Sequence, residues 1–163
     1  MPDDLKTVSY RGGVVRFRIP AGWIESYGTD GGGEFHDDDP QSGTLRLNVL
    51  TFEQTVEGHV ESAFEFLSRS AGQMRPGIEV IERADGNASL SYWEFAEEDG
   101  EDLAIRFWQV ANAVPPRHMR IAAFSYTLLK SQMSRPRFVA EVEMIDREIG
   151  MCEFAEEIGV VPT

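Results

Sequence analysis

Four extended segments separated by short turns lie between residues 77 and 129, and they constrain the fold of this chain more than any other feature. Their sequences, in order, are GIEVIER, ASLSYWEFAEE, EDLAIRFWQVANA and MRIAAFSYTLL, and the turns between them are ADGN, DG and VPPRH. Strands joined by connections this short lie antiparallel, because a parallel neighbour needs a crossover of about a dozen residues or more. The stretch therefore predicts a four-stranded antiparallel meander.

The third segment of the meander carries apolar side chains on both of its faces. Ile105 and Phe107 point to one side of the predicted sheet, and Trp108 and Val110 point to the other. A strand with this pattern is covered on both sides of its sheet. We therefore expect other elements to pack on both faces of the meander.

The N-terminal third of the chain indicates further strands. In TVSYRGGVVRFRIP we expect two strands joined at Gly12–Gly13, because glycine accepts the positive φ of a tight hairpin turn. Apolar and basic side chains alternate in the second strand, which is the period of a half-buried strand: Val15, Arg16, Phe17, Arg18 and Ile19. Shorter strands are expected at residues 22–28 and, on an edge, at 34–38, before a clear strand at 44–52.

In two segments the spacing of the apolar residues changes to that of an amphipathic helix. The first is expected at about residues 54–71, with a stop at Gly72 and this apolar face: Val56, Val60, Ala63, Phe64, Leu67 and Ala71. The second is expected from an N-cap at Ser134 to a stop at Gly150, with this apolar face: Phe138, Val142, Ile145 and Ile149. The tail, residues 151–163, either extends this helix or docks on the body.

These elements together predict an α+β fold. A single antiparallel sheet of about six or seven strands, flanked by a helix on each side, buries both helices and the two-sided strands. No repeat or linker divides the chain, so we expect one domain over residues 1–163 with its core at about 7–150.

The segment VVRFRIPAGW resembles the opening of the PsbP-like superfamily, with Phe17, Pro20 and Trp23 as the matching residues. A glycine-bearing turn, the strand GTLRLNVLTF and a helix follow in the order of that family, through about residues 7–149. The family includes PsbP, Ran-binding Mog proteins and bacterial DcrB-like proteins. The resemblance implies an α/β/α sandwich and a binding or adaptor role, in some bacterial relatives as chaperone-adaptors for secreted effectors. It assigns no partner-binding residue here.

The charge of the chain narrows the classes of partner. Its formal net charge is −13 at pH 7, which disfavours nucleic acid and anionic membranes because phosphates are bound by Lys and Arg. A basic protein, a cationic peptide or a divalent cation is compatible with this charge, and so is a surface that is acidic only for solubility. The N-terminus has no signal-peptide pattern and no apolar run is long enough to span a membrane, so we expect a cytoplasmic protein without membrane insertion.

The densest acidic stretch is EFAEEDGED at the second turn of the meander. We interpret it either as a docking site for a basic partner or as a solvated turn, and its candidate partner-binding residues are Glu97, Glu98, Asp99, Glu101 and Asp102.

The stretch GGGEFHDDDP at residues 31–40 lacks the lysine of a phosphate-binding loop. In an extended segment only Asp37 and Asp39 converge, and two ligands are too few for a dedicated cation site. We therefore interpret this stretch as a solvated loop.

Tryptophan and cysteine are two further residue types to consider for function. Trp23, Trp93 and Trp108 are expected in the core, although two of them in neighbouring strands could line a pocket between sheet and helix. Cys152 has no partner cysteine and no nearby base in the sequence, so we expect a small, partly buried apolar residue rather than a nucleophile.

The sequence shows no catalytic constellation and no cofactor or metal motif. The function it favours is a small non-enzymatic protein-binding or adaptor domain with an unidentified protein partner, and a basic partner would fit the charge of the chain. The alternative is a protein that binds a small molecule or divalent cation through the aromatic strands of its sheet, either as a simple binding protein or as an enzyme.

Overall fold

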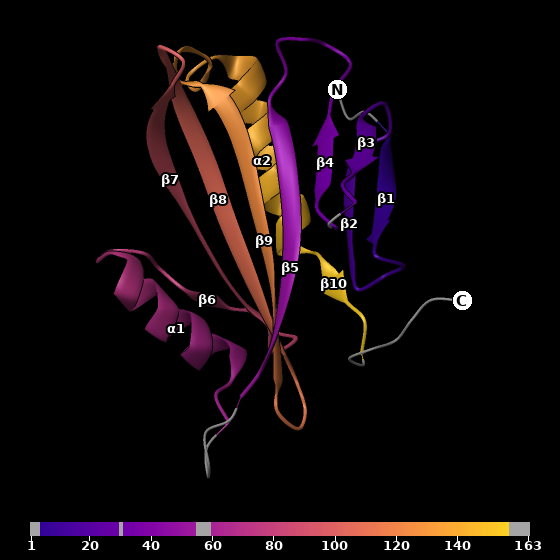
Figure 1. Cartoon of the computed structure of the whole chain (residues 1–163), viewed down its shortest axis with the longest axis vertical. Helices are drawn as coiled ribbons and strands as arrows, with labels where there is room; N and C mark the ends of the chain where they lie inside the picture. Colours follow the sequence, from indigo (N-terminus) through magenta and orange to yellow (C-terminus); the bar gives the residue numbers. More distant parts are fainter. Residues whose placement is uncertain (1–3, 30, 55–59, 157–163) are drawn as a thin grey trace.

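The computed structural model describes residues 4–29, 31–54 and 60–156. The elements are, in chain order, β1 (Leu5–Tyr10), β2 (Val15–Pro20), β3 (Ile24–Tyr27), β4 (Gly33–His36), β5 (Thr44–Glu53), α1 (Ala63–Met74), β6 (Ile81–Glu82), β7 (Ala88–Glu98), β8 (Glu101–Val114), β9 (His118–Leu129), the 3₁₀ turn η1 (Lys130–Gln132), α2 (Pro136–Gly150) and β10 (Glu153–Phe154). The predicted order of hairpin, strands, helix, four-stranded meander and helix is confirmed (Figure 1).

The strands form two sheets, and the prediction of a single sheet is wrong. Seven antiparallel strands follow the order β3-β4-β5-β9-β8-β7-β6, and β1, β2 and β10 form a separate sheet of three. The predicted meander is confirmed as β6 to β9, but its first strand contains only Ile81–Glu82. The predicted edge strand β4 lies between β3 and β5, so β3 forms the edge instead.

The main core lies between the large sheet, the small sheet and α2. Val15, Phe17 and Ile19 of β2 point into it, as their alternation with the arginines predicts. The Phe17 ring meets Phe35 of β4 and Phe124 of β9 edge-on, with ring centroids 5.4 and 5.2 Å apart. The N-terminal hairpin therefore packs face to face on the large sheet rather than extending it.

Helix α1 packs on the opposite face of the large sheet. Its buried residues Ala63, Leu67 and Ala71 meet a second apolar cluster formed by β7, β8 and β9: Ala88, Leu90, Ala111, Met119 and Ile121. Figure 1 shows that α1 crosses only the lower part of this face. One face of the large sheet thus carries a helix and a sheet, and the other carries one short helix.

The start of α1 differs from the prediction, although part of the predicted segment, 55–59, lies outside the described residues. The Ser62 side chain accepts a hydrogen bond from the Glu65 backbone N–H, and the Glu65 carboxylate accepts one from the Ser62 N–H. This capping box marks the start of α1. Gly72 lies inside the helix and does not end it. The predicted face also included Val60 and Phe64, which are exposed.

Helix α2 and the tail after it complete the main core. The predicted α2 residues Phe138, Ile145 and Ile149 are buried, although Arg135 and not Ser134 is the N-cap. After α2 the chain turns back, and β10 pairs with β2, so the tail docks on the body through residues 153–154. None of the described helices has the length and apolarity that a membrane span requires.

The first hairpin turn is longer than predicted. Tyr10 pairs with Val15, so residues 11–14 form the connection in place of a two-residue turn at Gly12–Gly13. Arg11, Gly12 and Gly13 all have positive φ. Two glycines supply most of this turn because they adopt such backbone angles without steric cost.

Candidate functional site

The acidic turn between β7 and β8 projects from one end of the large sheet. Asp99 and Gly100 form a two-residue turn with φ of 51° and 79°, the sign that a primed hairpin turn requires. Strand register then places Glu97 opposite Asp102 and Glu98 opposite Glu101. All five predicted residues of this acidic hairpin are exposed, and none forms an ion pair with another described residue: Glu97, Glu98, Asp99, Glu101 and Asp102.

Apolar side chains flank the acidic hairpin on both faces of the sheet. On the α1 side, Leu103 lies opposite Leu129, which is 36% exposed. On the other side, Phe95 is 56% exposed, and the Lys130 ammonium lies 5.2 Å from the centre of its ring. The carboxylates therefore border apolar surface rather than a wholly polar loop.

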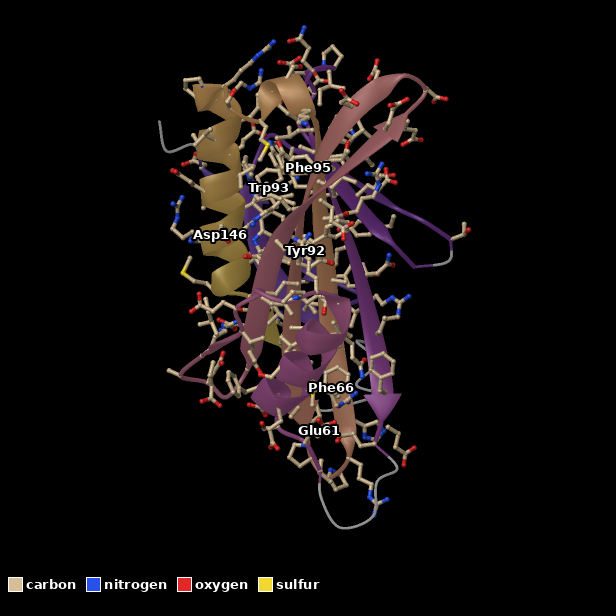
Figure 2. All side chains as sticks on the ribbon, turned by 90° about the vertical axis from the view of Figure 1, so that its left-hand side faces the viewer. Glu61, Phe66, Tyr92, Trp93, Phe95 and Asp146 are labelled. Atoms are coloured by element: carbon tan, nitrogen blue, oxygen red, sulfur yellow. The ribbon has the colours of Figure 1, made fainter. Side chains whose placement is uncertain are left out.

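The apolar surface on the α1 side continues along the strands toward that helix. We call this strip the open face, and its residues are Tyr92, Leu103, Ile105, Phe107 and Leu129. The Tyr92 and Phe107 rings stack with centroids 5.2 Å apart, and the Arg75 guanidinium lies 5.0 Å from the centre of the Tyr92 ring. No described helix crosses the sheet between Tyr92 and the acidic hairpin (Figures 1 and 2).

The two sides of β8 are therefore covered unequally, which corrects the expectation of cover on both faces. Trp108 and Val110, facing α2, are 3% and 0% exposed. Ile105 and Phe107, on the open face, are only partly buried. The sequence pattern marked both faces as apolar, and only the packing of α1 low on its face leaves one of them accessible.

The aspartates of GGGEFHDDDP form ion pairs with α2. Arg137 lies 2.7 Å from an Asp39 carboxylate oxygen, 3.6 Å from one of Asp37 and 3.5 Å from one of Glu141. Asp37 and Asp39 do converge as predicted, but on an arginine, so the loop is not merely solvated. The backbone N–H of Gln41 and then Arg137 lower the pKa of Asp39. The described residues contain no group of three acidic, His or Cys side chains placed to hold a metal ion.

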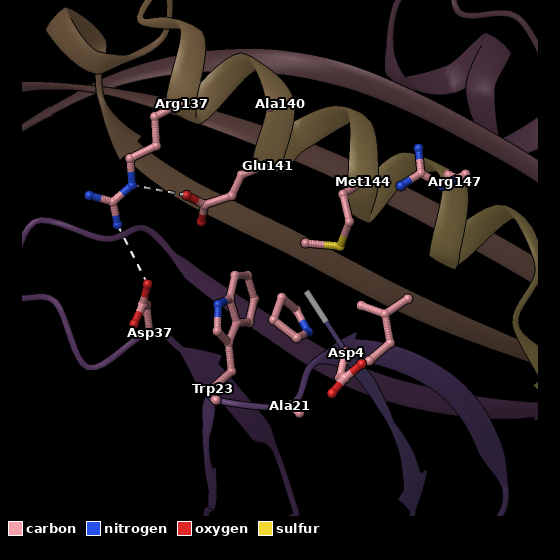
Figure 3. A pocket seen from close by; sticks show the side chains of 12 residues that line it. Asp4, Ala21, Trp23, Asp37, Arg137, Ala140, Glu141, Met144 and Arg147 are labelled. Atoms are coloured by element: carbon pink, nitrogen blue, oxygen red, sulfur yellow. Dashed lines mark ion pairs between the residues drawn. The ribbon is translucent and has the colours of Figure 1, made fainter. Parts of the chain in front are cut away.

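A groove of about 950 Å³ separates α2 from the chain around the ends of β1 and β2 (Figure 3). Trp23 and Met144 lie on opposite walls, and Arg137 stands at one end with its three carboxylate partners. The Trp23 ring stacks on Tyr126, whose hydroxyl donates a 2.6 Å hydrogen bond to Glu141. Because these charges are paired within the protein, the groove offers no unpaired cation at this end for an anionic ligand.

The remaining candidates are mostly core residues. Trp23 and Trp108 are 5% and 3% exposed, while Trp93 on the edge of the meander is partly buried. Cys152 is fully buried, and burial raises the pKa of its thiol to about 11. Its thiol is therefore protonated at neutral pH, which disfavours nucleophilic chemistry.

Comparisons with known structures identify the architecture. A Bacteroides thetaiotaomicron protein matches 93% of this chain with a TM-score of 0.64 at 16% identity, and this chain spans 49% of it. LpqN, involved in cell envelope biogenesis of Mycobacterium tuberculosis, matches with a TM-score of 0.60 at 9% identity over 93% of this chain and 91% of its own. The Saccharomyces cerevisiae Ran-binding protein Mog1p gives 0.54 at 13% identity over 94% and 96%.

The fold is similar to those of LpqN and Mog1p. The expected likeness to Mog proteins is thus supported at the level of the fold, whereas the resemblance of VVRFRIPAGW to the PsbP-like superfamily stays a prediction. No protein-family model matches the chain, and no curated protein matches its sequence. At these sequence identities, the structural likeness supports the same architecture but says nothing about the activity.

Proposed function

We propose that this chain is a non-enzymatic protein-binding domain that takes a basic partner segment on the acidic hairpin and the open face. The observation that carries the proposal is the continuity of these two surfaces. An apolar strip that includes the stacked Tyr92 and Phe107 rings runs to five exposed carboxylates that have no cationic partner among the described residues.

The two parts of this surface would act differently on a partner. The carboxylates would steer a cationic segment toward the hairpin and select it over acidic ones. Binding energy would come mainly from apolar anchors that bury the aromatic rings, because exposed charge pairs contribute little. The expected partner segment therefore combines Lys or Arg with at least one large apolar side chain.

The fold comparison is compatible with this role. Mog1p, which shares the architecture at 13% identity, is a Ran-binding protein, so this fold can present a surface to another protein. The proposal keeps the expected cytoplasmic location, which rests on the sequence alone.

The test compares two variants with the same change of charge. One carries Glu97→Gln, Glu98→Gln, Glu101→Gln and Asp102→Asn in the hairpin, and the control carries Glu53→Gln, Glu82→Gln, Glu143→Gln and Glu156→Gln at exposed sites elsewhere. Proteins captured from the native lysate are quantified by mass spectrometry at low and at moderate salt.

A protein captured by the native chain and the control, weakened by salt and lost with the hairpin variant, is the expected result. Phe107→Ala should lose the same protein. Equal capture by all four chains would overturn the proposal.

A further inference from the structure

Strand β7 has a hydrogen-bonded neighbour along its whole length on one side only. It pairs with β8 from Ala88 to Glu98, whereas on its outer side β6 pairs only with Ala88 and Ser89. No other described strand pairs with β7. Figures 1 and 2 show no described segment along the outer side of its upper part. We call residues 94–98 of β7 the open edge.

Two hydrogen bonds identify the backbone groups that point outward from β7. The Asn87 carbonyl oxygen, just before the strand, accepts a bond from the Arg83 N–H at 2.7 Å. The Trp93 carbonyl oxygen accepts one from Arg75 Nη2 at 2.9 Å. In an antiparallel strand, alternate residues direct both of their backbone groups to the same side, so every second residue after Asn87 faces outward. On the open edge, these residues are Phe95 and Glu97.

Arg75 marks the lower limit of the open edge. Its guanidinium occupies the Trp93 carbonyl oxygen, where a neighbouring strand would place an N–H, and so closes the edge there. Above that point, residues 94–98 are exposed. No hydrogen bond joins the outward N–H and C=O groups of Phe95 or Glu97 to another residue of the described chain. These four groups are therefore available to an added strand.

The side chains of the open edge define what such a strand would carry. Glu94, Ala96 and Glu98 lie on the side of the open face, and Phe95 and Glu97 lie on the other side, because successive side chains alternate. Lys or Arg opposite each glutamate forms an ion pair, and a large apolar side chain opposite Phe95 covers its ring. A second large apolar side chain fits opposite Ala96, since alanine is small and leaves room toward the open face.

A second copy of this chain fits the open edge poorly. If two open edges paired antiparallel about Ala96, Glu94 of each copy would lie directly opposite Glu98 of the other. Like charges in directly opposite positions destabilise a strand pair, and charged side chains are a common means of preventing edges from pairing with their own kind. The same carboxylates attract a cationic segment, so charge complementarity favours a basic partner as the occupant.

We propose that a basic segment of the partner binds the open edge as an added β-strand, antiparallel to β7. The inference rests on the proposed function, and it specifies the conformation and side-chain pattern of the segment that binds. Backbone hydrogen bonds to Phe95 and Glu97 hold the segment, and its alternating side chains provide the selectivity. From its N-terminus, the segment reads cation, cation, large apolar, large apolar, cation.

The test uses the synthetic peptide acetyl-Lys-Lys-Leu-Phe-Lys-amide and the full chain. In the proposed register, the phenylalanine of the peptide lies opposite Phe95 and directs its N–H to β7, while the leucine N–H points away. Two further peptides carry one N-methyl group each, either on the phenylalanine or on the leucine nitrogen. Methylation of the phenylalanine should weaken binding at least about tenfold, because a hydrogen bond is lost, and methylation of the leucine should change it less than about twofold.

Amide hydrogen exchange, measured by NMR, locates the added strand. With the parent peptide near saturation, the N–H groups of Phe95 and Glu97 should exchange several-fold more slowly. Those of Glu94 and Ala96 face β8 and should change little, so they are the internal control.

A pair of variants tests the same hydrogen bond from the side of the protein. Phe95→Pro and Phe95→Ala both remove the ring, but only proline removes the outward N–H, and an edge position tolerates it. The proline variant should therefore bind the parent peptide more weakly than the alanine variant. The comparison of the two N-methylated peptides needs no variant and decides the question even if the proline variant does not fold.

Three results would overturn the inference: no saturable binding of the parent peptide, equal binding of the two N-methylated peptides, or unchanged exchange at both Phe95 and Glu97. None of them decides the proposed function, which depends on the protein captured from the lysate. If capture depends on the acidic hairpin and Phe107 while the N-methylated peptides bind equally, the proposed function stands and the added strand does not.

Discussion

The two faces of the seven-stranded sheet are built from the same strands but are covered by different elements and to different extents. On the α2 face, a second sheet and a 15-residue helix enclose a core in which Phe124 and Tyr126 are 1% and 0% exposed. On the α1 face, a 12-residue helix covers the lower part, and Phe107 on the open face is only partly buried. The comparison indicates that stability is concentrated on one face, which leaves apolar surface on the other available for a partner.

The ion pairs show the same asymmetry. Arg18 with Glu148, and Arg137 with Asp37 and Asp39, tie α2 to the strands and loop around it. The five carboxylates of the acidic hairpin have no such partners among the described residues. A cluster of unpaired like charges raises the free energy of the folded chain slightly, and a cationic partner would remove that cost.

The largest expected difference between the faces comes from removing one aromatic ring on each. Phe124→Ala should lower the free energy of unfolding by about 4 kcal/mol, because it leaves a cavity among rings that pack edge-on. Phe107→Ala should cost only about 1 kcal/mol, because Phe107 is partly solvated and loses mainly its stacking on Tyr92. Urea unfolding of both variants measures this, and equal losses would contradict the assignment of stability to the α2 face.

A smaller effect should appear in the pH dependence of the free energy of unfolding, through the Cys152 thiol in the core on the α2 side. Burial raises the pKa of Cys152 from 9.0 to about 11. A raised pKa means that the folded state holds the proton more tightly, so this stabilisation is present below pH 9 and is lost as pH rises toward 11 and beyond.

Unfolding of the native chain and of Cys152→Ala from pH 8 to pH 11 isolates this thiol. The native chain should lose about 2 kcal/mol more than the variant across that range. Parallel curves for the two chains would show that Cys152 does not titrate in this way.

The smallest expected effect is at the acidic hairpin. Neutralising Glu97, Glu98, Glu101 and Asp102 removes two pairs of like charges that face each other across β7 and β8. Stability should rise by a few tenths of a kcal/mol, on the order of a cross-strand charge effect, and the gain should shrink with added salt. A loss of stability in thermal unfolding would mean that these carboxylates have a structural role.

Several features could be predicted because they depend on residues close together in the chain. The alternation of Val15, Phe17 and Ile19 with arginines identifies the buried side of β2, and the Asp-Gly turn sets the position of the acidic hairpin. The capping box of Ser62 and Glu65 was also readable in the sequence, and it would have placed the start of α1 correctly.

Other features were decided only by the tertiary structure. Alternation shows that one side of β2 is buried, but not that it packs on a different sheet. Asp39 and Arg137, which are 98 residues apart in the chain, meet only because α2 lies against the loop before β5. Arg106 and Asp146 approach only because α2 lies beside β8. Local periodicity determines which side of a helix or strand is apolar. Which other element packs on that side depends on contacts between distant segments, and no local pattern encodes those contacts.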